Sequence, residues 1–72
     1  MLQRKLGQRI ANLRKGRKLT QERLAEAVGC SVEFISLVER GVNAPSVAGL
    51  DKFAKIFRVE VKELFTFEEK KR

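Results

Sequence analysis

The segment from Thr20 to Gly41, TQERLAEAVGCSVEFISLVERG, limits the possible folds of this chain more than any other part of it. Apolar residues recur every three or four positions on either side of Gly29, which is typical of two short amphipathic helices joined by a turn of about three residues. Helices joined so closely cross steeply, so the residue at their contact must be small, as Ala25 is. Glycine suits the left-handed turn, and Ile35 and Val38 face back toward the first helix. The segment therefore predicts a helical hairpin.

The rest of the chain has the same helical spacing, and no stretch alternates as a strand would. Three hydroxyl residues are well placed to cap helix N-termini: Thr20, Ser31 and Ser46. Together these signals predict an all-α fold of five helices, within residues 2–16, 20–29, 31–41, 46–58 and 61–65. We assign residues 1–67 to one small domain and residues 68–72 to a charged, frayed C-terminal tail.

The charge of the chain is strongly basic. Sixteen Lys and Arg residues oppose nine Asp and Glu residues, for a net charge of +7, and seven of the basic residues precede the first acid, Glu22. Such a field attracts polyanions, nucleic acid above all, although a basic face that only aids solubility is the alternative interpretation. We expect Lys15, Arg17 and Lys18 to add long-range attraction rather than fixed contacts.

Longer segments carry a resemblance to a known family. LGQRIANLRKGRKLTQERLAEAVGCS, FISLVERG and NAPSVAGLDKFAKIFRVEVKELF run from Leu6 to Phe65, and within them LTQ, IS, ERG and PS follow in order, beginning at Leu19, Ile35, Glu39 and Pro45. These segments resemble the Cro and phage-repressor-like, Xre-type helix-turn-helix family of transcriptional regulators. The resemblance implies a five-helix, lambda-repressor-like DNA-binding domain whose helix-turn-helix is formed by helices two and three. It also implies sequence-specific binding to double-stranded DNA, usually by a two-fold dimer on a pseudo-palindromic operator.

The helix that starts near Ser31 is the expected recognition helix, because the second helix of such a motif enters the major groove. With Ile35 and Val38 turned inward, four outward positions match the family's base-facing positions: Val32, Glu33, Ser36 and Leu37. A glutamate can accept from a cytosine amino group, and aliphatic side chains can meet a thymine methyl. For Val32 and Leu37, partial packing against the fold is an equal alternative, and the operator sequence is not readable from these residues.

Phosphate contacts are implied at three further positions that match the family: Gln21, Arg40 and Asn43. The N-terminus of the second helix favours an anion beside Gln21 in any case. For Arg40 the alternative is a solvated cation at a helix end.

Two charged residues fall on core-facing stripes, since Arg14 lies four positions after Ile10 and Glu39 lies four after Ile35. An unpaired charge there would be costly, so we predict that Arg14 and Glu39 pair across the first and third helices. The family has a buried Arg–Glu bridge at the matching positions. Its expected role is structural, to fix the recognition helix.

A homodimer is the expected assembly, with isologous contacts from the fifth helix and the loop before it. The residues expected at this interface are Ile56, Arg58, Leu64, Phe65 and Phe67. For Phe67, fraying or contact with another protein is an equal alternative. An antitoxin, or an adaptor that uses the fifth helix and the tail to hold a partner protein, is the main competing function. A restriction–modification controller shares the same domain. The sequence does not distinguish an activator of transcription from the expected repressor.

The chain has no histidine and one cysteine, Cys30, so the usual zinc sites cannot be built and no disulfide can form within it. No Ser–His or Cys–His pair and no glycine-rich phosphate loop is present, so we expect neither enzymatic activity nor a metal or cofactor. Two interpretations of Cys30 stay open: a redox role, and that of a partly buried small residue that packs against the core. No apolar run approaches the roughly 20 residues of a membrane span and no signal peptide opens the chain, so a cytoplasmic location is expected.

Overall fold

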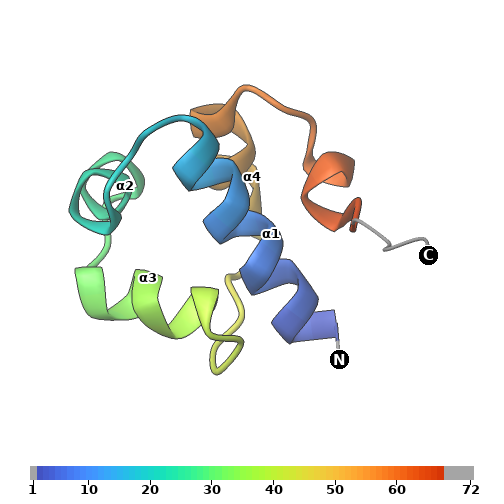
Figure 1. The fold of residues 1–72 in the computed structure, drawn as a ribbon, viewed down its shortest axis with the longest axis horizontal. Coiled ribbons are helices and arrows are strands. Elements are labelled where there is room, and N and C mark those ends of the chain that lie inside the picture. Colours follow the sequence, from blue (N-terminus) through green and yellow to red (C-terminus); the bar gives the residue numbers. More distant parts are fainter. Residues whose placement is uncertain (1, 68–72) are drawn as a thin grey trace.

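A computed structural model describes residues 2–67, which form four α-helices and one short 3-10 helix, with no strand among them (Figure 1). The elements are α1 (Leu2–Gly16), α2 (Gln21–Val28), α3 (Val32–Glu39), α4 (Val47–Phe57) and the 3-10 helix η1 (Val61–Phe65). The tail assigned to residues 68–72 lies outside the described residues.

The expected fifth α-helix is instead the 3-10 helix η1. Its hydrogen bonds join residues three apart, from the Glu63 N–H to the Glu60 carbonyl at 2.8 Å and from the Thr66 N–H to the Glu63 carbonyl at 3.3 Å. Five residues are too few to offset the cost of starting an α-helix, whereas one tight turn still places an apolar residue against the core. The prediction of an all-helical chain holds for the described residues, and the prediction of five α-helices does not.

The expected N-caps are present at three helices. The hydroxyl oxygens of Thr20, Ser31 and Ser46 each accept a hydrogen bond, at 3.0 Å, from the backbone N–H three residues later. Gly29 ends α2 in the left-handed conformation, with φ of +88°. Each cap satisfies a backbone group that the helix itself cannot pair, which stabilises the helix by about 1 kcal/mol.

The turn between α1 and α2 is held by a contact from Arg17. Gly16 is still helical, and Lys18 adopts the left-handed conformation with φ of +58°. The Arg17 Nε donates to the Phe57 carbonyl at 2.9 Å, and the guanidinium lies 5.7 Å from the centroid of the Phe57 ring. Arg17 therefore makes a fixed contact between the end of α1 and the end of α4, which the expectation of long-range attraction alone did not include.

The core lies around α1, which crosses the middle of the molecule with α2 and α3 on one side and η1 on the other (Figure 1). Its side chains come from all five elements: Leu6, Ile10, Leu13, Leu24, Ala25, Val28, Ile35, Val38, Phe53, Ala54, Phe57 and Leu64. The Phe53 and Phe57 rings stack within it at 6.2 Å between centroids. Ala25 is buried, as the steep crossing of α2 and α3 requires.

A second close approach joins α1 to α3 at Gly7. A Cβ atom built on Gly7 would collide with the carbonyl oxygen of Val38 and would lie 2.8 Å from that of Glu39. The two backbones therefore touch directly, with no room for a side chain between them. This contact sets the position of α3 on the body of the protein.

Candidate nucleic-acid interface

The helix α3 buries one apolar side in the core and leaves its first two residues in solvent. Ile35 and Val38 are almost fully buried, whereas Val32 is 38% exposed and Glu33 is exposed. Figure 1 shows α3 along the lower edge of the molecule, with one side of the helix uncovered. The helix is thus anchored from within while one side faces outward, which is the arrangement of a helix that reads a groove.

The four residues expected to face bases do not share one environment. Val32 and Glu33 are exposed, but Ser36 and Leu37 are half-buried. Partial packing, the alternative considered for the aliphatic residues, therefore applies to Leu37 more than to Val32. The structure leaves the first turn of α3 as its most accessible part.

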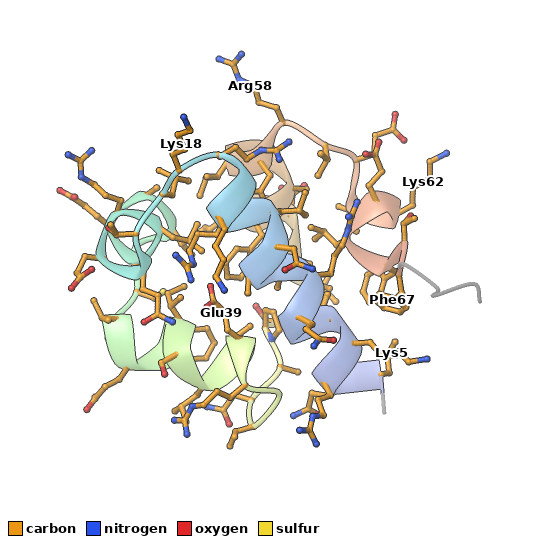
Figure 2. The ribbon with its side chains drawn as sticks, in the orientation of Figure 1. Lys5, Lys18, Glu39, Arg58, Lys62 and Phe67 are labelled. Carbon is orange, nitrogen blue, oxygen red and sulfur yellow. The ribbon has the colours of Figure 1, made fainter. Side chains whose placement is uncertain are left out.

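The expected ion pair between Arg14 and Glu39 is present at the junction of three helices. The Arg14 Nε donates to Glu39 Oε2 at 2.7 Å and Nη2 donates to Oε1 at 3.2 Å, while Nη1 donates to the Leu19 carbonyl at 2.8 Å. The two side chains are only 12% and 8% exposed. Figure 2 shows Glu39 inside the molecule, between α3 and α1. The two-pronged geometry fixes the orientation as well as the charge balance of the pair.

Gln21 belongs to the same network. Its Nε2 donates to Glu39 Oε1 at 3.0 Å, so the first residue of α2 is tied to the last residue of α3. Sequence reasoning expected the Gln21 amide at a phosphate and did not expect this bond. This bond uses one of the two N–H groups of the Gln21 amide.

The loop after α3 carries Arg40 and Asn43, both exposed. Gly41 turns the chain with φ of +81°, and the Gln3 side chain near the start of α1 donates to the carbonyls of Gly41 and Val42 at 3.1 and 2.9 Å. Sequence reasoning missed Gln3 because its partners are 38 and 39 positions away and no periodic pattern marks it. The loop is therefore held by α1 and its two polar side chains project from a fixed backbone.

The structure places the residues expected at a dimer interface in different environments. Leu64 is fully buried in the core, so its assignment to an interface was wrong: the 3-10 turn points this side chain inward. Phe65 and Phe67 pack edge to face at 6.4 Å, with the Lys5 ammonium 5.9 Å from the Phe67 centroid. Arg58 is exposed and lies at the top of the molecule, far from Phe67 (Figure 2). Ile56 is half-buried. The five residues therefore do not form one continuous patch.

The turn between α2 and α3 places Cys30 half in solvent and half against the core. Burial raises the pKa of the Cys30 thiol, and the charge of Lys52 lowers it by less. A raised pKa keeps the thiol protonated and weakens it as a nucleophile, which favours the interpretation of Cys30 as a packing residue. Among residues 2–67, no three His, Cys, Asp or Glu side chains gather where they could hold a metal ion. No described helix is long and apolar enough to cross a membrane.

Comparison with known proteins places this geometry in a family. The helix-turn-helix family model matches residues 10–64. An uncharacterized helix-turn-helix-type transcriptional regulator of Archaeoglobus fulgidus is 36% identical over 61 residues, which cover 85% of this chain and 86% of that protein. The restriction–modification controller protein C.AhdI of Aeromonas hydrophila is similar in structure, with a TM-score of 0.82, 37% identity, and coverage of 86% of this chain and 94% of that one. The master regulator for biofilm formation SinR, solved in complex with DNA, has a TM-score of 0.78 and 32% identity, over 85% of this chain and 98% of that one.

The chain therefore belongs to the helix-turn-helix family of DNA-binding transcriptional regulators, whose members are not enzymes.

Proposed function

We propose that this regulator reads a specific sequence by inserting α3 into the major groove of double-stranded DNA, and that it represses transcription where its operator overlaps a promoter. The observation that carries the proposal is the state of α3, buried through Ile35 and Val38 but exposed at Val32 and Glu33. A net charge of +7 supplies the long-range attraction to the duplex.

The proposed contacts fall into two kinds. Residues that face bases are Val32, Glu33, Ser36 and Leu37, with the exposed Val32 and Glu33 reaching deepest. Residues that hold phosphates are Gln21, Arg40 and Asn43, each at an end of a helix or in the loop after α3. Base contacts determine specificity, and phosphate contacts determine register and general affinity.

Binding to the DNA upstream of its own gene tests this proposal. Fluorescence anisotropy of a labelled duplex, with random duplex as competitor and salt varied, should show specific binding with a steep salt dependence. Glu33→Ala should lower the preference for the operator over random duplex by about tenfold, since a specific base contact is worth about 1–3 kcal/mol. Leu37→Ala should have a smaller effect, because Leu37 is half-buried.

Asn43→Ala is the control, because Asn43 is exposed and is proposed to touch only phosphate, so this change should weaken binding to every duplex alike. Equal, weak binding of the wild-type protein to all duplexes would contradict sequence-specific recognition. Thermal melting followed by circular dichroism must first show that each variant is folded.

The proposed assembly is a homodimer that places two α3 helices in successive major grooves, about 34–36 Å apart. Phe65, Phe67, Ile56 and Arg58 are the residues left for its interface once Leu64 is assigned to the core. Phe65→Glu should shift the protein toward monomer in light scattering and weaken binding to a two-half-site operator more than to a single half-site. A wild-type monomer at high concentration, with and without operator, would contradict the dimer. It would favour the competing proposal that Phe65 and Phe67 hold another protein, as an antitoxin or adaptor would.

A further inference from the structure

A polar pocket lies where the first half of α1 meets the end of α3 and the loop that follows it. It has a volume of about 440 Å³ and is lined by Arg4, Gln8, Glu39, Arg40 and Val42. Figure 1 shows these two helix ends converging at the lower side of the molecule, next to the uncovered side of α3. The pocket therefore adjoins the surface proposed to meet DNA, but two of its residues, Arg4 and Gln8, come from α1.

The walls of this pocket are fixed by contacts that involve backbone. Gln3 ties the carbonyls of Gly41 and Val42 to α1, and Gly7 lets the α1 backbone touch the carbonyls at the end of α3. On the loop side, a Cβ atom built on Gly41 would lie 2.8 Å from the Arg4 Cα, so these backbones are also in close contact. The positions from which Arg4 and Arg40 project are thus set before any ligand arrives, which lowers the ordering cost of binding.

The pocket carries positive charge that no described carboxylate pairs with. Among residues 2–67, neither Arg4 nor Arg40 is paired with a carboxylate, and both side chains are exposed. Glu39 also lines the pocket, but both of its oxygens already accept hydrogen bonds, from Arg14 and Gln21. The exposed amide of Gln8 adds an uncharged donor one helical turn from Arg4.

Two guanidinium groups and an amide donor are suited to an anion with several oxygen atoms, of which a phosphate is the common example. The lining includes no aromatic ring on which a free nucleotide's base would stack. The pocket instead continues the surface of α3 through Arg40, the residue directly after that helix. These features favour a phosphate within a polymer that already lies along α3.

We propose that Arg4 and Gln8 of α1, with Arg40, bind a DNA backbone phosphate in this pocket, so that the first helix as well as the helix-turn-helix determines the register of the protein on its operator. The inference rests on the proposed function and adds to it a contact outside the helix-turn-helix. In this arrangement Arg4 and Arg40 approach the phosphate from α1 and from the loop after α3, which joins the two elements through the ligand.

The test compares Arg4→Ala, Gln8→Ala and Arg4→Lys with the wild-type protein by anisotropy on operator and random duplexes over a range of salt. Arg4→Ala should weaken binding to both duplexes by about tenfold and reduce the slope of log K against log salt by about 1. Gln8→Ala should weaken binding roughly threefold with the slope unchanged, because no charge is removed. Arg4→Lys should keep most of the slope.

Lys55→Ala is the control with the same change of charge. Lys55 is exposed in the last turn of α4, three residues before Arg58, which Figure 2 shows at the end of the molecule opposite α3. If Arg4→Ala changes affinity and slope no more than Lys55→Ala does, the pocket proposal is overturned while the proposed function stands. If the wild-type protein binds no duplex, the proposed function fails and the pocket proposal fails with it. If Arg4→Ala leaves DNA binding unchanged but weakens the binding of inorganic phosphate to the free protein, the pocket is a free-anion site instead.

Discussion

Gly7→Ala is expected to lower the free energy of unfolding by about 3 kcal/mol, although it adds only one methyl group. The added Cβ atom would collide with the Val38 carbonyl oxygen and lie 2.8 Å from that of Glu39. Both obstacles are backbone atoms, which cannot rotate away as a side-chain end can. Relief therefore requires α1 and α3 to separate, which would open the core around Ile10 and Ile35.

Gly16→Ala is the matched control, because it makes the same change in the same helix. No atom lies within 4 Å of a Cβ built on Gly16, and its backbone is helical. Since glycine is a weaker helix former than alanine, Gly16→Ala should leave stability unchanged or raise it by up to about 1 kcal/mol. Urea unfolding followed by circular dichroism measures both effects, as the chain has no Trp or Tyr for fluorescence. Equal stability of the two variants would show that the α1–α3 contact yields easily.

Glu39→Ala is expected to cost roughly 3–5 kcal/mol, because it leaves Arg14 almost buried without its charge partner. The same substitution removes the acceptor of the Gln21 amide and so breaks the link between α2 and α3. A domain of 72 residues has little stability in excess of this amount, so the variant should be largely unfolded at 37 °C. The same urea titration measures the loss.

Two controls separate the buried charge from other effects of this substitution. Glu33→Ala changes the same residue type in the same helix but at an exposed position, and should cost less than about 1 kcal/mol. The double variant Arg14→Met with Glu39→Leu removes both charges, and should be more stable than Glu39→Ala alone. If the double variant loses as much as the sum of its two single substitutions, the penalty does not come from a stranded charge.

Local signals in the sequence were enough to predict the helices and most of their ends. Thr20, Ser31 and Ser46 cap helices as expected because each bond is made to a residue three positions away. The Arg14–Glu39 pair was also predictable, since two charges on core-facing stripes have to find each other. The type of η1 was not, because five apolar-rich residues fit an α-helical turn and a 3-10 turn equally well.

Contacts between distant positions explain what the sequence did not reveal. The absence of a side chain at Gly7 matters only because the end of α3 lies against it, and that proximity is a property of the folded chain. In the sequence, Arg17 cannot be distinguished from other solvated cations, because its partner at the end of α4 is distant along the chain. The burial of Leu64 is likewise a property of the folded chain, because the turn η1 places this side chain in the core.

The division of α3 into buried anchors and an exposed first turn has a consequence for how such a protein changes over generations. Substitutions at Val32 and Glu33 meet few neighbours, so they should alter stability by no more than about 0.5–1 kcal/mol. Under the proposed function, substitutions at these two positions change the preferred DNA sequence while the protein stays folded. Duplicated genes of this kind can diverge in their targets while retaining one scaffold.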